Sequence, residues 1–400
     1  MNGRLITRIK MIVLRVITKV KIEIRKPIYT FLNRNNNKQF DFAHVTLYSC
    51  GNAGDTVLSE CIRRLFDIKF ADKINWKLLN LHEKVNIQYL QKLNSVDAVI
   101  VGGHGAFLPD TNKNTISGWG WACGREQYKK IKAPLLVFAI GYNYFFGQQE
   151  TDLFKENVNA LLRKSLFFGL RNGGSVRKIQ EMIANDREKS KVEYQPCPTM
   201  IARMLYPEIP SKKITNKVAF NVALDRADMR MGDEKNQNII LSQIAKSMYE
   251  LYKRGYEIHF IVHVYHEVAF LDYINQYKFK YYYHPVTSWG AKKIFSLYNE
   301  MDVVIGMRGH GIWIPFGVNC KIISLGNQNK TKWFLEDIEA LDWLVDINEN
   351  PENLGNRIIE MFIRIHEKEG NKTTERLLKA QQKLYEITMK NMDFIYNQIG

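Results

Sequence analysis

Short apolar runs recur along the chain, and most of them end in glycine followed by a polar side chain. Their content of Val, Ile, Leu and Phe is typical of strands that are buried on both faces of a parallel sheet. Helical patterns separate most of these runs, and strands that alternate with helices predict an α/β fold with parallel sheets. The predicted strands are residues 44–49, 97–101, 134–140, 166–170, 218–223, 258–264, 281–285, 303–305 and 322–325.

The pattern is most informative at residues 303–317. A β-branched run stops at Gly306, and Arg308, Gly309 and His310 follow before an apolar segment that can begin a helix. Such a corner lies at the carboxyl end of a parallel sheet, where open α/β sheets bind ligands, and N–H groups at a helix start favour an anion. Arg308 and His310 are therefore candidates to hold a carboxylate or phosphate and to move a proton. In the alternative interpretation, Arg308 pairs with a structural carboxylate and His310 caps the helix.

Polar groups also follow the predicted strands of the N-terminal half. Because the carboxyl ends of parallel strands meet at one edge of the sheet, we expect these groups to form a single rim. The rim residues are His104, Asn143, Arg171 and Ser175.

Residues 51–55 (GNAGD) form a glycine-rich turn between a predicted strand and a helical pattern. The turn lacks the GxGxxG spacing, so it does not predict a dinucleotide site. Two interpretations remain open. Asp55 caps the helix, or Asn52 and Asp55 face a sugar hydroxyl.

The pattern divides the chain into four parts. Residues 207–216 contain two prolines and mixed polar residues, as is typical of a domain boundary. The C-terminal residues carry charges at helical i, i+4 spacing and no chemical signal, and we expect them to pack across the domains. The expected parts are a basic amphipathic extension at 1–40, a Rossmann-like domain at 41–206, a second at 207–345 and C-terminal helices at 346–400.

Charge is concentrated at the N-terminus. The formal net charge is +16, and residues 1–40 hold ten Lys/Arg and one acid, which is +9 of that total. Residues 4–24 place apolar side chains at helical spacing with basic residues between them, which predicts an amphipathic basic helix. Arg15 and Lys19 interrupt any apolar core of a signal peptide, and no apolar run is long enough to span a bilayer. The helix either lies on an anionic membrane surface through residues 1–30 or packs on the protein with its charges solvated.

The cysteine and histidine patterns do not favour a metal site. Five cysteines are scattered without a CxxC pair, which argues against a disulfide framework or zinc and for a reducing compartment. His259, His263 and His266 have ligand-like spacing, but a strand puts the first two on one face without an evident third ligand. We therefore expect no metal and no cofactor.

Taken in order, the motifs resemble those of the polysaccharide pyruvyl transferase family. They cover roughly residues 44–340, and the sequence departs from the family pattern at Gly309, the middle residue of its RxH pair, and at His104, where the family has glycine. The matching pieces are GNAGD (51–55), VGGHGAF (101–107), PLLVFAIGYN (134–143), LFFGLRNGGS (166–175), PCP (196–198), VIGMRGHGIWIPFG (304–317) and KIISL (321–325) with Lys330.

The resemblance implies two Rossmann-like domains of glycosyltransferase-B-like architecture with an interdomain cleft. It also implies transfer of pyruvate from phosphoenolpyruvate to two hydroxyls of one sugar, which gives a cyclic ketal. Arg308, Gly309, Arg171 and Ser175 would bind the donor, with Arg308 and His310 as catalytic residues.

The remaining candidates, Asn52, Asp55, His104 and Asn143, are assigned to the acceptor or to a secondary role, with His104 as a second acid/base candidate. The expected acceptor is a glycan of a surface polysaccharide, exopolysaccharide or capsule, or its lipid-linked precursor. The expected location is cytoplasmic and peripheral, on the inner face of the cytoplasmic membrane.

Two other functions compete with this interpretation. A nucleotide-sugar glycosyltransferase would share the architecture, since fold does not fix function, but no clear base or ribose carboxylate follows the strand at 321–325. A non-enzymatic, basic polyanion-binding protein is the other. Outside residues 1–40 there is no basic stripe interleaved with aromatic residues and no nucleic-acid motif, so we expect no nucleic-acid partner.

Overall fold

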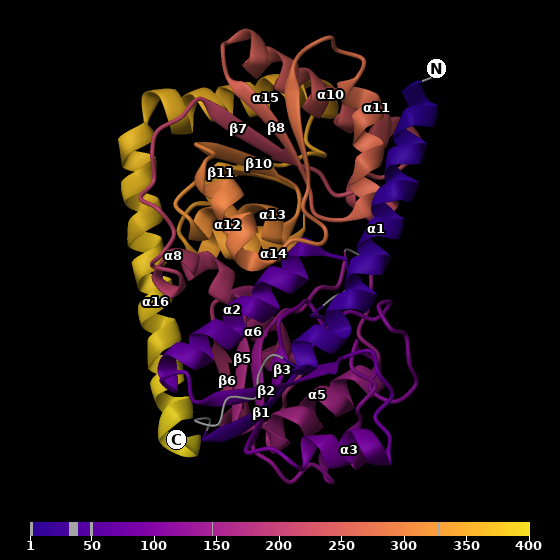
Figure 1. Cartoon of the computed structure of the whole chain (residues 1–400), viewed down its shortest axis with the longest axis vertical. Coiled ribbons are helices and arrows are strands. Elements are labelled where there is room, and N and C mark those ends of the chain that lie inside the picture. Colours follow the sequence, from indigo (N-terminus) through magenta and orange to yellow (C-terminus); the bar gives the residue numbers. More distant parts are fainter. Residues whose placement is uncertain (1–2, 32–38, 49–50, 146, 327) are drawn as a thin grey trace. The chain divides into compact units, whose positions relative to one another are not determined.

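The chain forms two parallel six-stranded sheets with helices packed on them, which confirms the predicted α/β class (Figure 1). The computed structural model describes residues 3–31, 39–48, 51–145, 147–326 and 328–400. The described chain divides into two compact units. We call residues 25–50, 58–198 and 384–400 the N-terminal unit, and residues 1–24, 51–57 and 199–383 the C-terminal unit.

The sheet of the N-terminal unit has the strand order β2-β1-β3-β4-β5-β6, and every pair is parallel. Its direction of growth reverses between β1 and β3, and such a reversal marks the ligand-binding crevice of open α/β sheets. The strands are β1 (Phe40–Thr46), β2 (Ile74–Asn80), β3 (Ala98–Gly102), β4 (Leu135–Ile140), β5 (Phe167–Leu170) and β6 (Val192–Tyr194).

The helices of the first half begin after these strands, as the alternating pattern predicts. They are α2 (Ala53–Lys69), α3 (Ile87–Leu93), α4 (Arg125–Tyr128), α5 (Asp152–Lys164), α6 (Gly173–Glu181) and α7 (Asp186–Lys189), and η1 (Pro198–Ile201) and α8 (Ala202–Leu205) lead into the next sheet. The central strands β3 and β4 are buried along their whole length, so their uniform apolar character reflects contact on both faces.

The sheet of the C-terminal unit has the order β12-β11-β10-β7-β8-β9, again with every pair parallel. Here the reversal lies between β7 and β10. The strands are β7 (Lys217–Asn221), β8 (Glu257–Val262), β9 (Tyr281–Pro285), β10 (Val303–Gly306), β11 (Lys321–Leu325) and β12 (Leu344–Val345).

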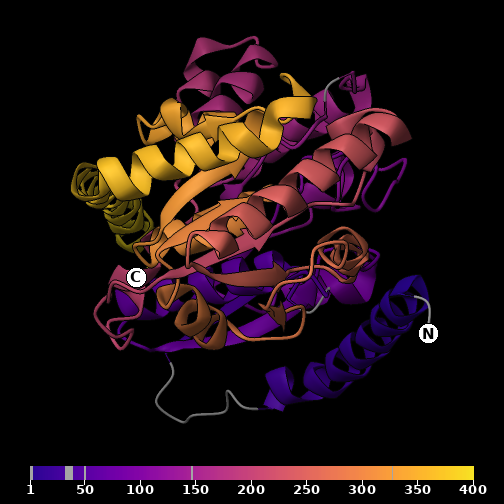
Figure 2. The same cartoon turned by 90° about the horizontal axis from the view of Figure 1, so that it is seen from above.

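The helices of this second sheet include α10 and α15, which pack side by side (Figure 2). Helix α13 is apolar apart from His310 in its first turn, and its other side chains are buried against α12, β10 and β11. The elements are α9 (Ala227–Met231), α10 (Glu234–Lys253), η2 (Tyr265–Phe270), α11 (Leu271–Ile274), α12 (Ala291–Asn299), α13 (Gly309–Gly317), α14 (Asn329–Asp337), η3 (Leu341–Trp343), η4 (Pro351–Asn353), α15 (Leu354–Phe362), the π-helix η5 (Ile363–Lys368) and α16 (Gly370–Ile399).

The compact units differ from the expected domain boundaries in three places. The predicted basic helix is present as α1 (Gly3–Phe31), and its residues up to Ile24 belong to the C-terminal unit. The GNAGD turn, expected in the N-terminal domain, also belongs to the C-terminal unit, and residues 384–400 belong to the N-terminal unit. Residues 33–38 (NRNNNK), whose polar composition predicts a linker, lie outside the described residues.

Candidate functional site

The sheet reversal in the C-terminal unit positions Arg308. Gly306, the last residue of β10, pairs with Asn221, the last residue of β7, and the Met307 N–H donates to the Asn221 carbonyl at 3.0 Å. The chain then leaves both strands at the same edge of the sheet, and Arg308 occupies the N-cap position of α13. The predicted strand–loop–helix corner is therefore confirmed, and it lies where open parallel sheets bind ligands.

Arg308 is held by two carboxylates from neighbouring strand ends. Its Nε donates to Glu267, which lies in η2 after β8, and its Nη2 donates to Asp225, which follows β7. The Arg308 side chain is 12% exposed and that of Glu267 is 0% exposed. Asp225 also accepts from Arg230 Nη2 at 3.0 Å. The alternative that Arg308 pairs with carboxylates is thus what the structure shows, and a guanidinium held on two sides has a fixed orientation.

Glu267 is bonded on its other side as well. Its Oε2 accepts from the His263 backbone N–H at 2.7 Å and from Asn221 Nδ2 at 3.1 Å. Burial raises the pKa of Glu267 to about 7, although Arg308 acts in the opposite direction. Burial also acts to raise the pKa of Asp225, but Arg308 and Arg230 hold that pKa well below its usual range. The two carboxylates beside Arg308 therefore differ: Asp225 is ionised, and Glu267 titrates near neutral pH.

His310 lies in the first turn of α13, half-buried, between two other residues of the C-terminal unit. Its ring stands nearly perpendicular to that of Trp313, with 4.9 Å between the ring centroids. On another side it packs on Gly54 of the GNAGD turn, where an added Cβ would lie 2.5 Å from His310 Nδ1. The Ala53 N–H, which donates to the His263 carbonyl at 3.1 Å, fixes this turn against β8. Two motifs that are distant in the sequence therefore meet at one imidazole.

The polar residues of the GNAGD turn are engaged with each other. Asn52 directly precedes α2, and its Oδ1 accepts from the Gly54 N–H at 3.0 Å. Its Nδ2 donates to Asp55 Oδ2 at 2.9 Å. The helix cap is therefore Asn52 rather than Asp55, and Asp55 supports it from the first turn.

Three of the predicted rim residues gather in the N-terminal unit. Arg171, which follows β5 and is 2% exposed, donates from Nη2 to Asn143 Oδ1 at 2.7 Å. Asn143 Nδ2 in turn donates to the Gly105 carbonyl at 3.3 Å, in the loop that also carries His104. Arg171 crosses the end of β4 because Gly141 has no side chain there: an added Cβ would lie 2.0 Å from Arg171 Nε.

His104 is a buried and electrically neutral ring. It is 3% exposed, and neither ring nitrogen has a hydrogen-bond partner within the described ranges. Burial, together with the positive charges of His82 and Arg171, lowers the pKa of His104 to about 3. A neutral imidazole has one N–H donor and one acceptor nitrogen, and within the described ranges both are buried here without a protein partner.

Ser175 has a structural set of contacts. Its side chain is completely buried, and its Oγ accepts from the Tyr142 N–H at 3.0 Å. Its own N–H donates to Asn172 Oδ1 at 2.7 Å, which makes Asn172 the cap of α6. Ser175 therefore joins the end of β4 to the start of α6, and its hydroxyl is used inside the unit.

The sequence pattern does not single out Glu267 or Asp225 as site residues. Both follow the ends of predicted strands, and an acid at the carboxyl end of a parallel strand was the available signal. What the pattern could not supply was the strand order that places β7 between β8 and β10.

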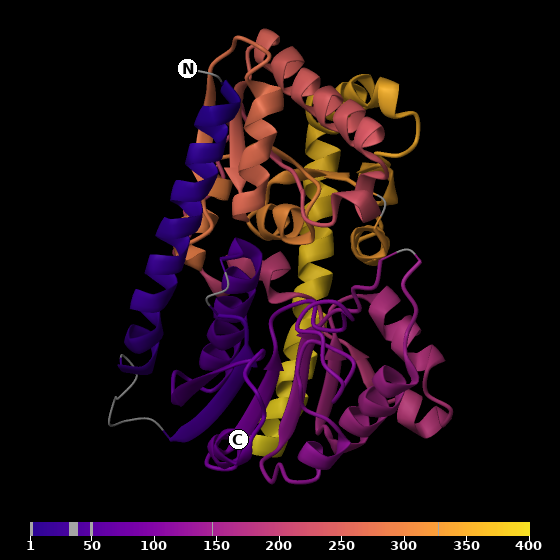
Figure 3. The ribbon, with the colours of Figure 1, turned by 90° about the vertical axis from the view of Figure 1, so that its right-hand side faces the viewer.

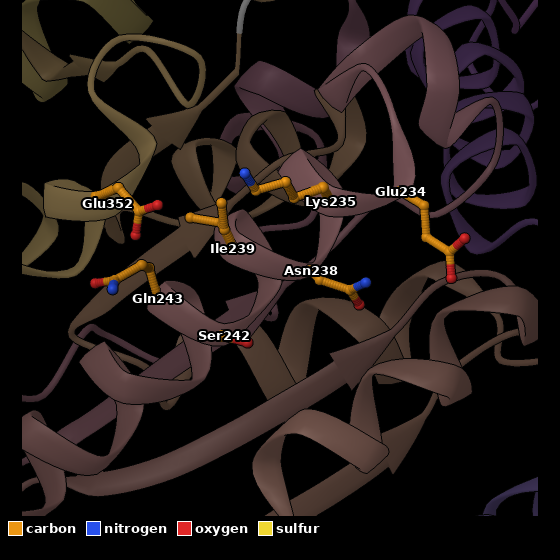
Figure 4. A pocket seen from close by; sticks show the side chains of 7 residues that line it. All are labelled: Glu234, Lys235, Asn238, Ile239, Ser242, Gln243 and Glu352. Carbon is orange, nitrogen blue, oxygen red and sulfur yellow. The ribbon is translucent and has the colours of Figure 1, made fainter.

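The three histidines with ligand-like spacing do not gather. His259 contacts His284 at 2.9 Å and Glu257 at 2.8 Å, whereas His263 Nε2 contacts the Tyr298 hydroxyl at 2.7 Å. Within the described ranges, no group of three or more His, Cys, Asp or Glu side chains is arranged to hold a metal ion. A pocket elsewhere in the C-terminal unit is formed by α10 and Glu352 and contains none of the predicted site residues (Figure 4).

Comparisons with known proteins agree with the motifs. The family model of polysaccharide pyruvyl transferases matches residues 51–329. No curated protein matches the chain. The structure of S. aureus MnaA with UDP is 10% identical and has a TM-score of 0.50, with 85% of this chain and 91% of that chain covered. A putative UDP-N-acetylglucosamine 2-epimerase from Listeria monocytogenes is 9% identical with a TM-score of 0.51, covering 85% and 90%. These two likenesses concern the fold alone, and together with the two parallel sheets they confirm Rossmann-like domains of glycosyltransferase-B type.

Proposed function

The chain belongs to the polysaccharide pyruvyl transferase family, and from this membership we propose that it transfers pyruvate from phosphoenolpyruvate to two hydroxyls of one sugar. The product is a cyclic ketal on a surface polysaccharide or its lipid-linked precursor, and the second product is inorganic phosphate. The observation that carries the proposal is the Arg308–His310 corner at the reversal of the C-terminal sheet. A fixed guanidinium, the N-terminus of α13 and an imidazole stand there within one turn of chain.

The proposed donor carries a carboxylate and a phosphate, and the corner suits such an anion. Arg308 uses Nε and Nη2 for its two carboxylates, and within the described ranges its Nη1 donates to no protein group. The N–H groups at the start of α13 supply uncharged donors beside it. We assign the donor to this corner. The role of Arg171 in donor binding stays a prediction, and within the N-terminal unit Asn143 orients its guanidinium.

We assign two proton transfers of the reaction to His310. The imidazolium gives a proton to the donor's methylene carbon, which becomes a methyl group; the first sugar hydroxyl attacks the cationic centre at the adjacent carbon and returns a proton to the imidazole. The bond between that carbon and the phosphate oxygen then breaks, the second hydroxyl attacks the same carbon to close the ring, and its proton leaves with the phosphate. An imidazole has an ordinary pKa near neutral and therefore gives and accepts protons at physiological pH.

His104 is better suited to binding than to acid catalysis in this scheme. Because its pKa is about 3, the ring is neutral at physiological pH and has no proton to give as an imidazolium. Its two ring nitrogens, one donor and one acceptor, have no protein partner within the described ranges, and we propose that two hydroxyls of the acceptor sugar supply the partners. We therefore place His104 and Asn143 in the acceptor site, with Asn52 and Asp55 as structural support for His310.

The test is a direct assay with two donor classes. Incubation with phosphoenolpyruvate and a panel of sugar acceptors is expected to release phosphate and to add a ketal methyl group, visible by NMR, to one acceptor. Incubation with UDP- and GDP-sugars is expected to release no nucleotide. Release of nucleotide with no phosphate from phosphoenolpyruvate would favour a glycosyltransferase, and binding of anionic polymers without turnover of either donor would favour a non-enzymatic role.

Donor binding can be followed separately from turnover. Phosphoenolpyruvate is expected to raise the thermal unfolding temperature, since a ligand of the folded state stabilises it by mass action. UDP is expected to leave that temperature unchanged. The opposite result would remove phosphoenolpyruvate from the proposal.

A further inference from the structure

Helix α1 packs on the C-terminal unit through a narrow and partly polar face. Of the described side chains on this helix, Thr7, Leu14 and Thr18 are buried. The Thr18 and Thr287 hydroxyls are hydrogen-bonded at 2.8 Å, and the Arg15 guanidinium lies 5.4 Å from the Tyr265 ring centroid. Figure 3 shows the helix lying along the unit beside α11. The alternative that α1 packs on the protein is thus true for one of its faces.

The opposite face of α1 is apolar and exposed. With about 100° of rotation per residue, Ile9, Val16 and Val20 lie about 160–200° around the helix from Thr18. Each is between 46% and 54% exposed. A helix of a soluble protein normally turns its apolar stripe to the core, and α1 does the reverse. The exposed apolar residues are Ile6, Ile9, Ile12, Val13, Val16, Ile17 and Val20.

Basic side chains border this apolar face on both sides. By the same rotation, Arg8 and Lys19 lie about 80–100° from Thr18 on one side, and Lys10 and Lys21 lie about 60–80° from it on the other. No acidic residue occurs between positions 6 and 21. An apolar strip between two rows of cations matches a bilayer surface, where the strip enters the acyl region and the cations reach the phosphate groups.

We propose that the outer face of α1 binds the surface of an anionic lipid bilayer, with the helix lying in the plane of the interface. Charge complementarity selects this occupant over a second copy of the chain, because two such faces would bring like-charged rows together. No described helix is long and apolar enough to cross a bilayer, so attachment at the surface is the mode available to α1. The proposal is independent of the reaction proposed above.

Vesicle flotation of the full chain tests the proposal. We expect flotation with vesicles of phosphatidylglycerol and phosphatidylethanolamine, release by high salt, and little flotation with pure phosphatidylcholine. The variant I9E/V16E places two carboxylates in the centre of the exposed face and is expected to lower binding at least tenfold. The variant R8Q/K19Q keeps the apolar face and is expected to weaken binding about 25-fold, from about fivefold for each cation.

The matched control is L378E/F394E on α16, where both residues are also exposed and apolar, at 44% and 47%. It adds the same charge to another helix and is expected to float like the native protein. Circular dichroism and thermal unfolding of all variants verify that they fold, and turnover of a soluble sugar is expected to be unchanged. That last measurement separates a failure here from a failure of the proposed reaction.

Three results would overturn the proposal. They are absence of native binding to the anionic vesicles, flotation of I9E/V16E equal to the native protein, and an equal loss of flotation in the α16 control. A native dimer that I9E/V16E converts to a monomer, without vesicle binding by either, would identify a second copy of the chain as the occupant instead.

Discussion

Glu267 accepts a hydrogen bond from Arg308 Nε while its own carboxylate is completely shielded from water. The pair forms a cluster of four with Asp225 and Arg230, and the more exposed Arg226 lies 3.6 Å from Asp225. Of the four, Glu267 is the group whose pKa burial brings to about 7. The charge beside the proposed donor site therefore depends on pH through one buried residue.

Replacing Glu267 with Gln is expected to remove a pH dependence of donor binding. Below about pH 7 the native Glu267 is protonated, and the cluster of four carries one net positive charge; above it, the cluster is neutral. An anionic donor should then bind about five- to tenfold more tightly on the acidic side, which corresponds to ~1 kcal/mol. Titration calorimetry with phosphoenolpyruvate between pH 5.5 and 8.5 measures this, and E267Q should stay tight throughout. Protonation of phosphoenolpyruvate itself affects its binding to the native protein and to E267Q equally. Parallel plots of affinity against pH for the two proteins would therefore contradict the prediction.

The same residue gives a stability prediction with a definite sign. The folded-state pKa of Glu267 lies above its ordinary value of 4.5, so the folded state binds more protons than the unfolded state between about pH 4.5 and 7. The contribution of Glu267 to the free energy of unfolding therefore falls as pH rises through that range. Thermal unfolding of native protein and E267Q should show the native protein losing stability relative to the variant from pH 5 to 7.5. A constant difference would mean that Glu267 is ionised throughout.

Arg308→Lys is expected to be far more damaging than its charge conservation suggests. A guanidinium reaches Glu267 and Asp225 from two different nitrogens, whereas one ammonium cannot occupy both positions. Leaving a buried carboxylate without its partner typically costs ~3–5 kcal/mol. R308K should therefore lower the unfolding temperature and weaken phosphoenolpyruvate binding. The matched control is R226K, since Arg226 also lies beside Asp225, at 3.6 Å, but is more exposed. Equal effects of the two variants would show that only the net charge matters.

The sequence identified the Arg308 corner because everything that defines it is local. Val303, Val304 and Ile305 are fully buried, Gly306 ends the strand, and α13 begins at Gly309, as the change from apolar to glycine-rich residues predicts. The ends of strands and helices can be predicted from the sequence, because they depend on the burial and backbone conformation of residues that are adjacent in the chain.

The partners of the corner could not be predicted in the same way. Glu267 follows β8, and it reaches Arg308 because only β7 separates β8 from β10 in the sheet. The strand order is set by the packing of the whole sheet. Gly54 meets His310 across more than 250 positions, and a glycine in a turn gives no sign of which side chain will occupy the space beside it. The two interpretations of Arg308 are compatible, because a guanidinium has enough donors to bind carboxylates and a ligand together.

The contact between Gly54 and His310 predicts a nonadditive pair of mutations. His310→Ala is expected to reduce turnover about 10²-fold or more, as loss of one acid/base group typically does. Gly54→Ala adds a methyl group that would lie 2.5 Å from His310 Nδ1, so the ring must move and turnover should fall by a similar factor. In the double variant the ring is absent, and Gly54→Ala should then have little further effect. Turnover assays of the four proteins complete the cycle, and additive losses would show that Gly54 acts independently of His310.

His104→Phe is expected to affect stability and acceptor binding in opposite directions. Phenylalanine keeps a planar ring but removes two buried nitrogens that have no protein hydrogen-bond partner within the described ranges, so the unfolding temperature should be unchanged or higher. If those nitrogens bind a sugar hydroxyl, the acceptor KM should rise about tenfold, from the loss of two hydrogen bonds of ~0.5–1.5 kcal/mol each. Because the pKa of His104 is about 3, the pH profile of kcat should keep its shape.

The control H82F alters a nearby but exposed ring. A lower unfolding temperature with an unchanged acceptor KM would make His104 a structural residue, since burial without a ligand contact would then explain its effect.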